Sequence, residues 1–174
     1  MGLSMDRPAA YLLGVRTREQ GGRIMDERIR ISIPADDEGF VSFQCPNCHD
    51  RFKLHAAEVD EEEWTDLYCP LCGLSNEPGA FLTPEVREVA QAHAENLVQD
   101  LLDDMLKGLE QRARSNKFIK FTRGSKPRKV PIPELREVSD LAIAKYPCCG
   151  RSAKVPHSDA LSGTYCPYCG TEHV

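Results

Sequence analysis

The chain has 174 residues and a net charge of −5, with 28% of its residues charged and only 7% aromatic. It contains no apolar run long enough to cross a membrane, and residues 1–25 lack the continuous apolar core of a secretory signal, which argues against a membrane or secreted protein. We therefore expect a cytoplasmic protein whose eight cysteines stay reduced, a state that favours metal binding over disulfides.

Charge is distributed unevenly along the chain. Residues 1–111 have a net charge of −12, whereas residues 112–174 have a net charge of +7. A basic region can bind phosphates, and it can equally bind an acidic region of its own or a neighbouring chain. The imbalance is therefore compatible with nucleic-acid binding and with protein association.

The N-terminal region predicts a disordered tail followed by short strands. Residues 1–25 show no sustained periodicity, and Met25 is an alternative start because the first patterned stretch follows it. Residues 28–33 alternate between polar and apolar side chains, as a half-buried strand does, and residues 40–43 form a second apolar run after a turn. We expect these two strands to pair as a hairpin that precedes the first cysteine pair.

Residues 83–115 predict a long amphipathic helix. Thr83 is suited to the N-cap and Pro84 to the first turn, and apolar side chains then recur at steps of three and four to about residue 114. This apolar face has two interpretations. It packs on the rest of the chain as a common core, or part of the 84–114 helix pairs with a second copy in a homo-dimer.

Residues 116–140 predict a basic segment and an extended linker, in which residues 134–140 favour a short helix. No acidic residue occurs between residues 112 and 129, while Phe118 and Phe121 could stack on unpaired bases. The candidate nucleic-acid-binding residues are Lys117, Lys120, Arg123, Lys126, Arg128 and Lys129.

The first cysteine block has the spacing of a four-thiolate zinc site. Cys45 and Cys48 form one pair, and Cys69 and Cys72 form the second. Proline after the first cysteine of each pair stiffens the turn, and Gly73 permits the left-handed conformation that closes the second one. Four thiolates fill a tetrahedral ion and leave no position for substrate, so this spacing predicts a structural zinc site.

The second cysteine block departs from this pattern. Cys149, Cys166 and Cys169 keep the register, but Tyr146 stands where the first thiolate belongs and Cys148 occupies a spacer position. The candidates for the fourth ligand are Cys148, His157 and His173, and a collapsed site without metal is a further alternative. Eight cysteines divided into two sets of four favour Cys148 and two zinc ions in total.

These motifs resemble the zinc-ribbon class, including short prokaryotic and transcription-type ribbons, over residues 40–82 and 141–174. The resemblance implies an α+β protein of small metal-stabilised modules. Two β zinc ribbons, within residues 26–82 and residues 141–174, the second of them degenerate, would be joined by the long helix and the basic linker. Ribbons of this class bind DNA, RNA or protein, so the resemblance alone does not select a function.

Three functions are compatible with the sequence, and the first two lack enzymatic activity. The favoured one is a non-enzymatic zinc-ribbon protein that binds nucleic acid through its basic C-terminal half. The alternative is a protein–protein adaptor or assembly subunit that uses the ribbons and the long helix. A third function is an iron-binding redox protein, because Cys-Pro-x-Cys-Gly turns also resemble those of rubredoxins.

Overall fold

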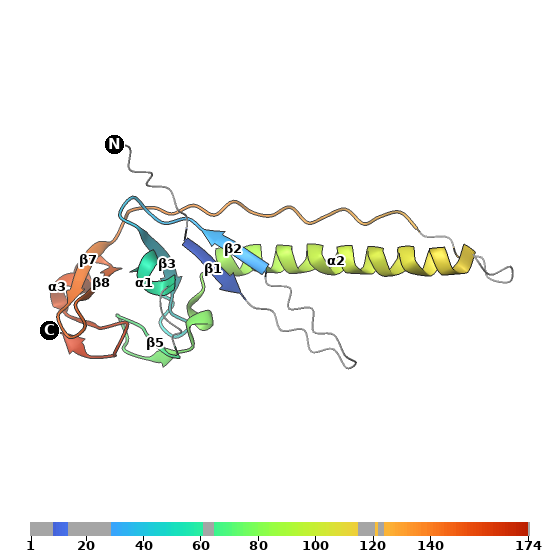
Figure 1. The fold of residues 1–174 in the computed structure, drawn as a ribbon. Helices are drawn as coiled ribbons and strands as arrows, with labels where there is room; N and C mark the ends of the chain where they lie inside the picture. The colour runs from blue at the N-terminus through green and yellow to red at the C-terminus, as the bar shows by residue number, and fades with distance from the viewer. Residues whose placement is uncertain (1–8, 14–28, 61–64, 115–120, 122–123, 174) are drawn as a thin grey trace, which may run out of the picture.

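A computed structural model gives the arrangement of residues 9–13, 29–60, 65–114, 121 and 124–173. It is a small α+β structure, in which short antiparallel strands form a head at one end and a long helix, α2, projects from it (Figure 1). The helix α2 spans Pro84–Arg114. None of the helices in this described part of the chain is both long and apolar enough to cross a membrane.

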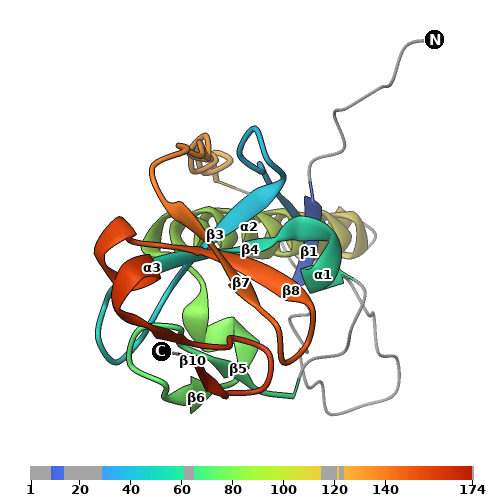
Figure 2. The same ribbon diagram turned by 90° about the vertical axis from the view of Figure 1, so that its left-hand side faces the viewer.

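The central sheet of the head combines two hairpins that are far apart in the sequence. Strands β3 (Phe40–Gln44) and β4 (Arg51–His55) form one hairpin, and β7 (Ala142–Tyr146) and β8 (Arg151–Val155) form the other. The strand order is β3-β4-β8-β7, all antiparallel, so β4 and β8 join the hairpins (Figure 2). The two units that the sequence places on either side of the helix therefore share one sheet.

Each hairpin is followed by a short helix and a two-residue ladder. Helix α1 (Ala56–Asp60) precedes strands β5 (Leu67–Tyr68) and β6 (Ser75–Asn76), which pair with each other. In the second unit, α3 (His157–Ser162) precedes β9 (Thr164–Tyr165) and β10 (Glu172–His173). We call β3 to β6 the first unit and β7 to β10 the second unit.

The predicted N-terminal hairpin and tail differ from the structure. Strand β2 (Ile29–Ile33) pairs with β1 (Ala9–Leu13), which lies in the predicted tail, and β3 pairs with β4 instead of β2. The reason is that the turn at Asp36 separates β2 from β3, while the cysteine pair brings β3 and β4 together. The rest of the predicted tail lies outside the described residues.

One core joins the units, β2 and the first half of α2. Phe52, on β4, stacks near Phe43 with ring centroids 5.9 Å apart and meets the edge of Phe81 at 5.7 Å. Residue Phe81 ends the 3-10 turn η1 (Pro78–Phe81), just before the helix. Val86 and Val89 of α2 join the same buried cluster, together with Val155 of the second unit. Neither unit has to supply a complete core alone, which a module of this size rarely can.

The N-terminus of α2 is capped as the sequence predicts. The Thr83 side-chain oxygen accepts a hydrogen bond from the Val86 amide at 3.4 Å. Val86, Val89 and Ala92 are buried against the head, whereas the outer half of the helix exposes its large apolar side chains. The first half of the helix thus packs on the rest of the chain, and pairing of the outer half with a second copy stays a prediction.

Residues 124–140, which we call the strap, run back along α2 towards the head (Figure 1). Asn96 of the helix makes two hydrogen bonds with Val130, one to its backbone oxygen at 2.9 Å and one from its backbone amide at 2.8 Å. The short helix predicted at residues 134–140 is wrong, because this part of the strap is extended. Glu137 accepts hydrogen bonds from the amide and hydroxyl of Ser42, which hold the strap on the sheet.

Candidate metal centres

The first cluster brings together the four cysteines that the sequence singles out. Its four sulfurs lie within 4.8 Å of one another, with Cys45 Sγ 3.7 Å from Cys72 Sγ and Cys48 Sγ 3.7 Å from Cys69 Sγ. With Zn–S bonds of about 2.3 Å, tetrahedral geometry separates two sulfurs by about 3.8 Å. A disulfide would need about 2.05 Å. The spacing therefore fits four ligands of one ion and not two cystines.

Local backbone geometry sets this arrangement. The turn after each cysteine pair closes with an amide hydrogen bond to the first cysteine, from His49 to Cys45 at 3.1 Å and from Gly73 to Cys69 at 2.9 Å. Both closing residues have positive φ, 65° for His49 and 73° for Gly73, as the sequence predicts for the glycine. Further amides point at the sulfurs, including that of Leu71 at 3.4 Å from Cys69 Sγ.

Burial and backbone hydrogen bonds together set the pKa values of the thiols in the first cluster. It raises the pKa of the Cys69 thiol, and it raises the pKa of the Cys48 thiol to about 12. Burial also opposes ionisation of Cys45, but backbone hydrogen bonds from Cys48 and Asn47 outweigh it and lower the pKa of Cys45. A buried group of thiols of this kind needs a cation to become thiolate, and binding of that cation releases protons.

The second cluster is more exposed than the first, and its cysteines approach one another in two close pairs. Cys149 Sγ lies 3.4 Å from Cys166 Sγ, and Cys148 Sγ lies 3.5 Å from Cys169 Sγ. Of these four residues only Cys166 is buried. The sulfurs of Cys148, Cys149 and Cys166 lie within 4.8 Å of one another. Four thiols therefore surround a second position that could hold a metal ion.

A fifth donor adjoins this second cluster. His173 Nε2 lies 3.1 Å from Cys148 Sγ, and its ring meets the Tyr146 ring edge-on with centroids 5.6 Å apart. His157 begins α3 and belongs to neither of the donor groups found among the described residues. Hydrogen bonds from Thr171 lower the pKa of Cys169 to about 7, which makes this sulfur a ready thiolate. The structure thus places two of the three candidate fourth ligands, Cys148 and His173, beside the cluster.

Tyr146 occupies the place that Cys45 has in the first unit. Gly150 donates to the Tyr146 oxygen at 2.9 Å, the same bond that His49 makes to Cys45. The Tyr146 ring is buried, its hydroxyl lies 3.1 Å from Thr164 Oγ1, and burial raises its pKa to about 12. A neutral buried phenol is a poor ligand, so the donor at this side of the cluster has to come from Cys148 or His173.

The two units contact each other reciprocally through their second cysteine turns. The Tyr68 amide donates to the Pro167 oxygen at 2.9 Å, and the Tyr165 amide donates to the Pro70 oxygen at 2.9 Å. A Cβ atom at Gly73 would lie 3.2 Å from the Tyr165 ring, and one at Gly170 would lie 2.7 Å from the Tyr68 ring. These matched contacts indicate that an internal pseudo-twofold axis relates the two units. The sequence did not reveal this symmetry, because the cysteines of the second unit are shifted relative to those of the first.

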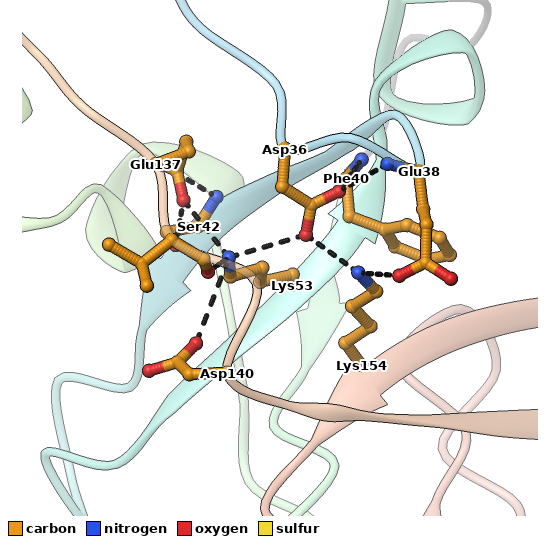
Figure 3. A network of polar contacts seen from close by, with 9 residues as sticks. Asp36, Glu38, Phe40, Ser42, Lys53, Glu137, Asp140 and Lys154 are labelled. Carbon is orange, nitrogen blue, oxygen red and sulfur yellow. Dashed lines mark hydrogen bonds and ion pairs between the residues drawn. The ribbon is translucent and has the colours of Figure 1, made fainter.

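A buried ionic network lies where strands β4 and β8 join the two units (Figure 3). Lys53 of β4 and Lys154 of β8 are opposite each other in the sheet, and Asp36 Oδ2 lies 3.3 Å from Lys53 Nζ and 2.7 Å from Lys154 Nζ. All three side chains are at most 3% exposed. Lys53 has two further carboxylates, Glu137 at 3.3 Å and Asp140 at 3.9 Å, and Lys154 has one, Glu38.

Sequence analysis missed this network, because a lysine in an alternating strand normally indicates the solvent face. Only the strap and the β2–β3 turn make that face an interior. The carboxylate that the two lysines share comes from Asp36, and although burial raises its pKa, the bonds from Lys154, Phe40 and Glu38 outweigh that effect and lower it. The ion pairs of this network therefore hold the two units together. Their described contacts leave no open position for a metal ion or ligand.

The candidate nucleic-acid-binding residues are only partly described. Lys117, Lys120 and Arg123 lie outside the described residues. Lys126 Nζ lies 3.5 Å from Asp103 Oδ2, and Lys129 Nζ lies 2.6 Å from Asp100 Oδ2, so these two side chains bind the acidic side of α2. Arg128 is exposed. Part of the basic segment is thus neutralised within the chain.

The fold and the clusters together define a small α+β protein with two cysteine groups that could each bind a metal ion. Comparisons with protein-family models, with curated proteins and with solved structures give no match for this chain. The chemistry of the two clusters and of the projecting helix is consequently what bears on its function.

Proposed function

We propose that the protein is a non-enzymatic zinc-binding assembly subunit, in which two zinc ribbons form the head and α2 is the arm that contacts another protein chain. The observation that carries the zinc assignment is the first cluster. Its sulfur separations of 3.7 Å match a tetrahedral four-thiolate zinc ion and come from two turns with hydrogen bonds to the sulfurs.

The donor set of the first cluster supports the non-enzymatic part of the proposal. An ion bound by four thiolates has no position for water or substrate, so it contributes to folding and not to a reaction. In the second cluster, four sulfurs and the His173 nitrogen compete for four positions, which again leaves none open.

The assembly role is supported by the outer half of α2. Val98, Leu102, Met105 and Leu109 are each about half exposed or more, at 53%, 52%, 65% and 49%. A contiguous apolar surface of this kind is typical of interaction sites. The strap, which could have covered it, is bound elsewhere on the helix by Asn96 and Asp100.

Metal analysis tests the zinc assignment directly. Elemental analysis of the intact protein should find two zinc ions per chain, and cobalt substitution should give the intense charge-transfer bands of thiolate ligands. A ferric tetrathiolate would be red and would favour the redox alternative.

Because structural zinc contributes about 10–16 kcal/mol of apparent binding free energy, a strong chelator should unfold the head, as followed by circular dichroism. A metal-free protein with an unchanged spectrum would refute the assignment.

Nucleic-acid binding, which the sequence favours, is the second candidate, and the exposed Arg128 next to the paired Lys126 and Lys129 is the feature that still supports it. It requires an affinity for oligonucleotides that falls steeply with salt. Arg128→Ala should then weaken binding without disturbing the strap, because the strap is held by its neighbours. No binding at low salt would eliminate this candidate and leave the assembly role standing.

A further inference from the structure

The exposed apolar side chains of α2 form one narrow seam. Val98, Leu102, Met105 and Leu109 are separated by four, three and four residues, which is the spacing of the inner positions of a coiled coil. They are among the most exposed large apolar side chains of the helix. Leu101 and Leu106 flank the seam and are 45% and 37% exposed. A surface with this spacing fits a second helix better than a flat or concave partner.

Among the described residues, the contacts between α2 and the strap lie on the side of the helix away from the seam. Asn96, Asp100 and Asp103 bind the strap, and at 3.6 residues per turn they lie about 160° around the helix from the seam. Val86 and Val89, which anchor the helix to the head, lie on the strap side as well. A helix laid along the seam would therefore meet neither the strap nor the head along residues 98–109.

The charges of the helix are arranged so that the seam can meet a copy of itself. Extending the coiled-coil spacing by one step at each end reaches Glu95 and Arg112. The positions that flank the seam on either side, from residue 94 to residue 113, hold Ala94, Gln99, Leu101, Leu106, Gly108 and Ala113, none of which is charged. The other charged side chains of this stretch, among them Asp103 and Lys107, project to the sides or towards the strap.

Antiparallel pairing places opposite charges together. When Leu102 of one copy packs against Met105 of the other, Val98 meets Leu109 and Glu95 meets Arg112 at both ends. Parallel pairing would instead place Glu95 against Glu95 and Arg112 against Arg112, which is repulsive. The sequence of this face is thus complementary to itself in one orientation.

We infer that the partner of α2 is a second copy of this chain, bound antiparallel through the seam formed by Val98, Leu102, Met105 and Leu109. This inference rests on the proposed assembly role and names its partner. Six apolar side chains from each copy, about half exposed in the single chain, would bury on the order of 1,000 Å² in total, which is the lower bound for a specific interface. The dimer would hold the two heads at opposite ends of the helix pair.

Analytical ultracentrifugation of the full zinc-loaded chain tests the inference. The wild-type chain should sediment as a dimer at micromolar concentration, and Leu102→Asp should make it a monomer, because an unpaired carboxylate would enter the seam. Zinc content and circular dichroism of the same samples should be unchanged, since Leu102 is exposed and does not belong to the described core of the head. Loss of zinc in the wild-type chain would instead mean failure of the proposed function, so the two failures are distinguishable.

Charge swaps test the orientation. Glu95→Arg should weaken the dimer at least tenfold by placing two arginines together at each end, and the double variant Glu95→Arg with Arg112→Glu should restore it. Asp104→Arg, an exposed charge reversal off the seam, is the matched control and should have no effect. A wild-type monomer would overturn the inference. A dimer that Leu102→Asp leaves intact would overturn the assignment of the seam as its interface. A dimer insensitive to Glu95→Arg would overturn the antiparallel orientation.

Discussion

Replacing Asp36 by Asn should destabilise the protein by about 3 kcal/mol. The substitution keeps the size of the side chain and the oxygen that accepts the amides of Glu38 and Phe40 at 3.1 and 3.0 Å. It removes the charge that lies 2.7 Å from Lys154 and 3.3 Å from Lys53. Two ammonium groups would then remain in an interior where both are at most 3% exposed.

The magnitude follows from what remains around the lysines. Removing one partner of a buried ion pair typically costs about 3–5 kcal/mol, because the other charge is left without compensation. Here Lys53 keeps Glu137 at 3.3 Å and the exposed Asp140 at 3.9 Å, and Lys154 keeps Glu38, which is 54% exposed and thus a solvated, weaker partner. These remaining carboxylates place the expected cost of Asp36→Asn at the low end of the range.

Urea unfolding at a fixed zinc concentration measures this free energy, since bound metal adds to apparent stability. The control is Asp37→Asn, a charge removal at the exposed neighbouring position, which should change stability by less than about 0.5 kcal/mol. A loss below about 1 kcal/mol for Asp36→Asn, with the same denaturant dependence as the wild-type chain, would show that the buried lysines are not held by this carboxylate.

Three further predictions follow from the structure. Burial lowers the pKa of Lys154, but its carboxylate partners outweigh burial and raise this pKa above the value in the unfolded chain. The stability that the charged Lys154 contributes is therefore complete below about pH 10.4 and is lost as the pH rises through the pKa of the folded state. Urea unfolding at increasing alkaline pH should show this loss of stability, and Lys154→Met should remove it. Cys148→Ser should remove the second metal ion, whereas His173→Ala should retain it, as measured by elemental analysis; the opposite result would make His173 the fourth ligand. Gly170→Ala should lower the free energy of unfolding by more than the roughly 1–2 kcal/mol that a left-handed alanine costs, because its Cβ would lie 2.7 Å from the Tyr68 ring. Gly150→Ala, which has a similar φ but open space around the Cβ, should cost only the backbone strain. Equal losses of stability in thermal unfolding would contradict the packing argument.

Features that depend on neighbouring residues could be predicted from the sequence. The first cluster and its left-handed Gly73 follow from the spacing of two cysteine pairs, and α2 follows from Thr83, Pro84 and the apolar repeat. In each of these cases the interactions that fix the structure span only a few residues, so a local pattern contains them. Donor chemistry, too, is a property of residue type: four cysteines indicate a closed metal site wherever they meet.

Features that depend on distant residues were decided only by the tertiary structure. The joining of the two hairpins, the extended strap and the burial of Lys154 beside Asp36, 118 positions away, have no local signal. The placement of both Cys148 and His173 at the second cluster was likewise decided by the fold, because the sequence left three candidates for the fourth ligand. The sequence determined which groups can bind metal and where a helix forms. Tertiary packing determined which charges are buried and which helix face stays open, because burial depends on what the rest of the chain places against each residue.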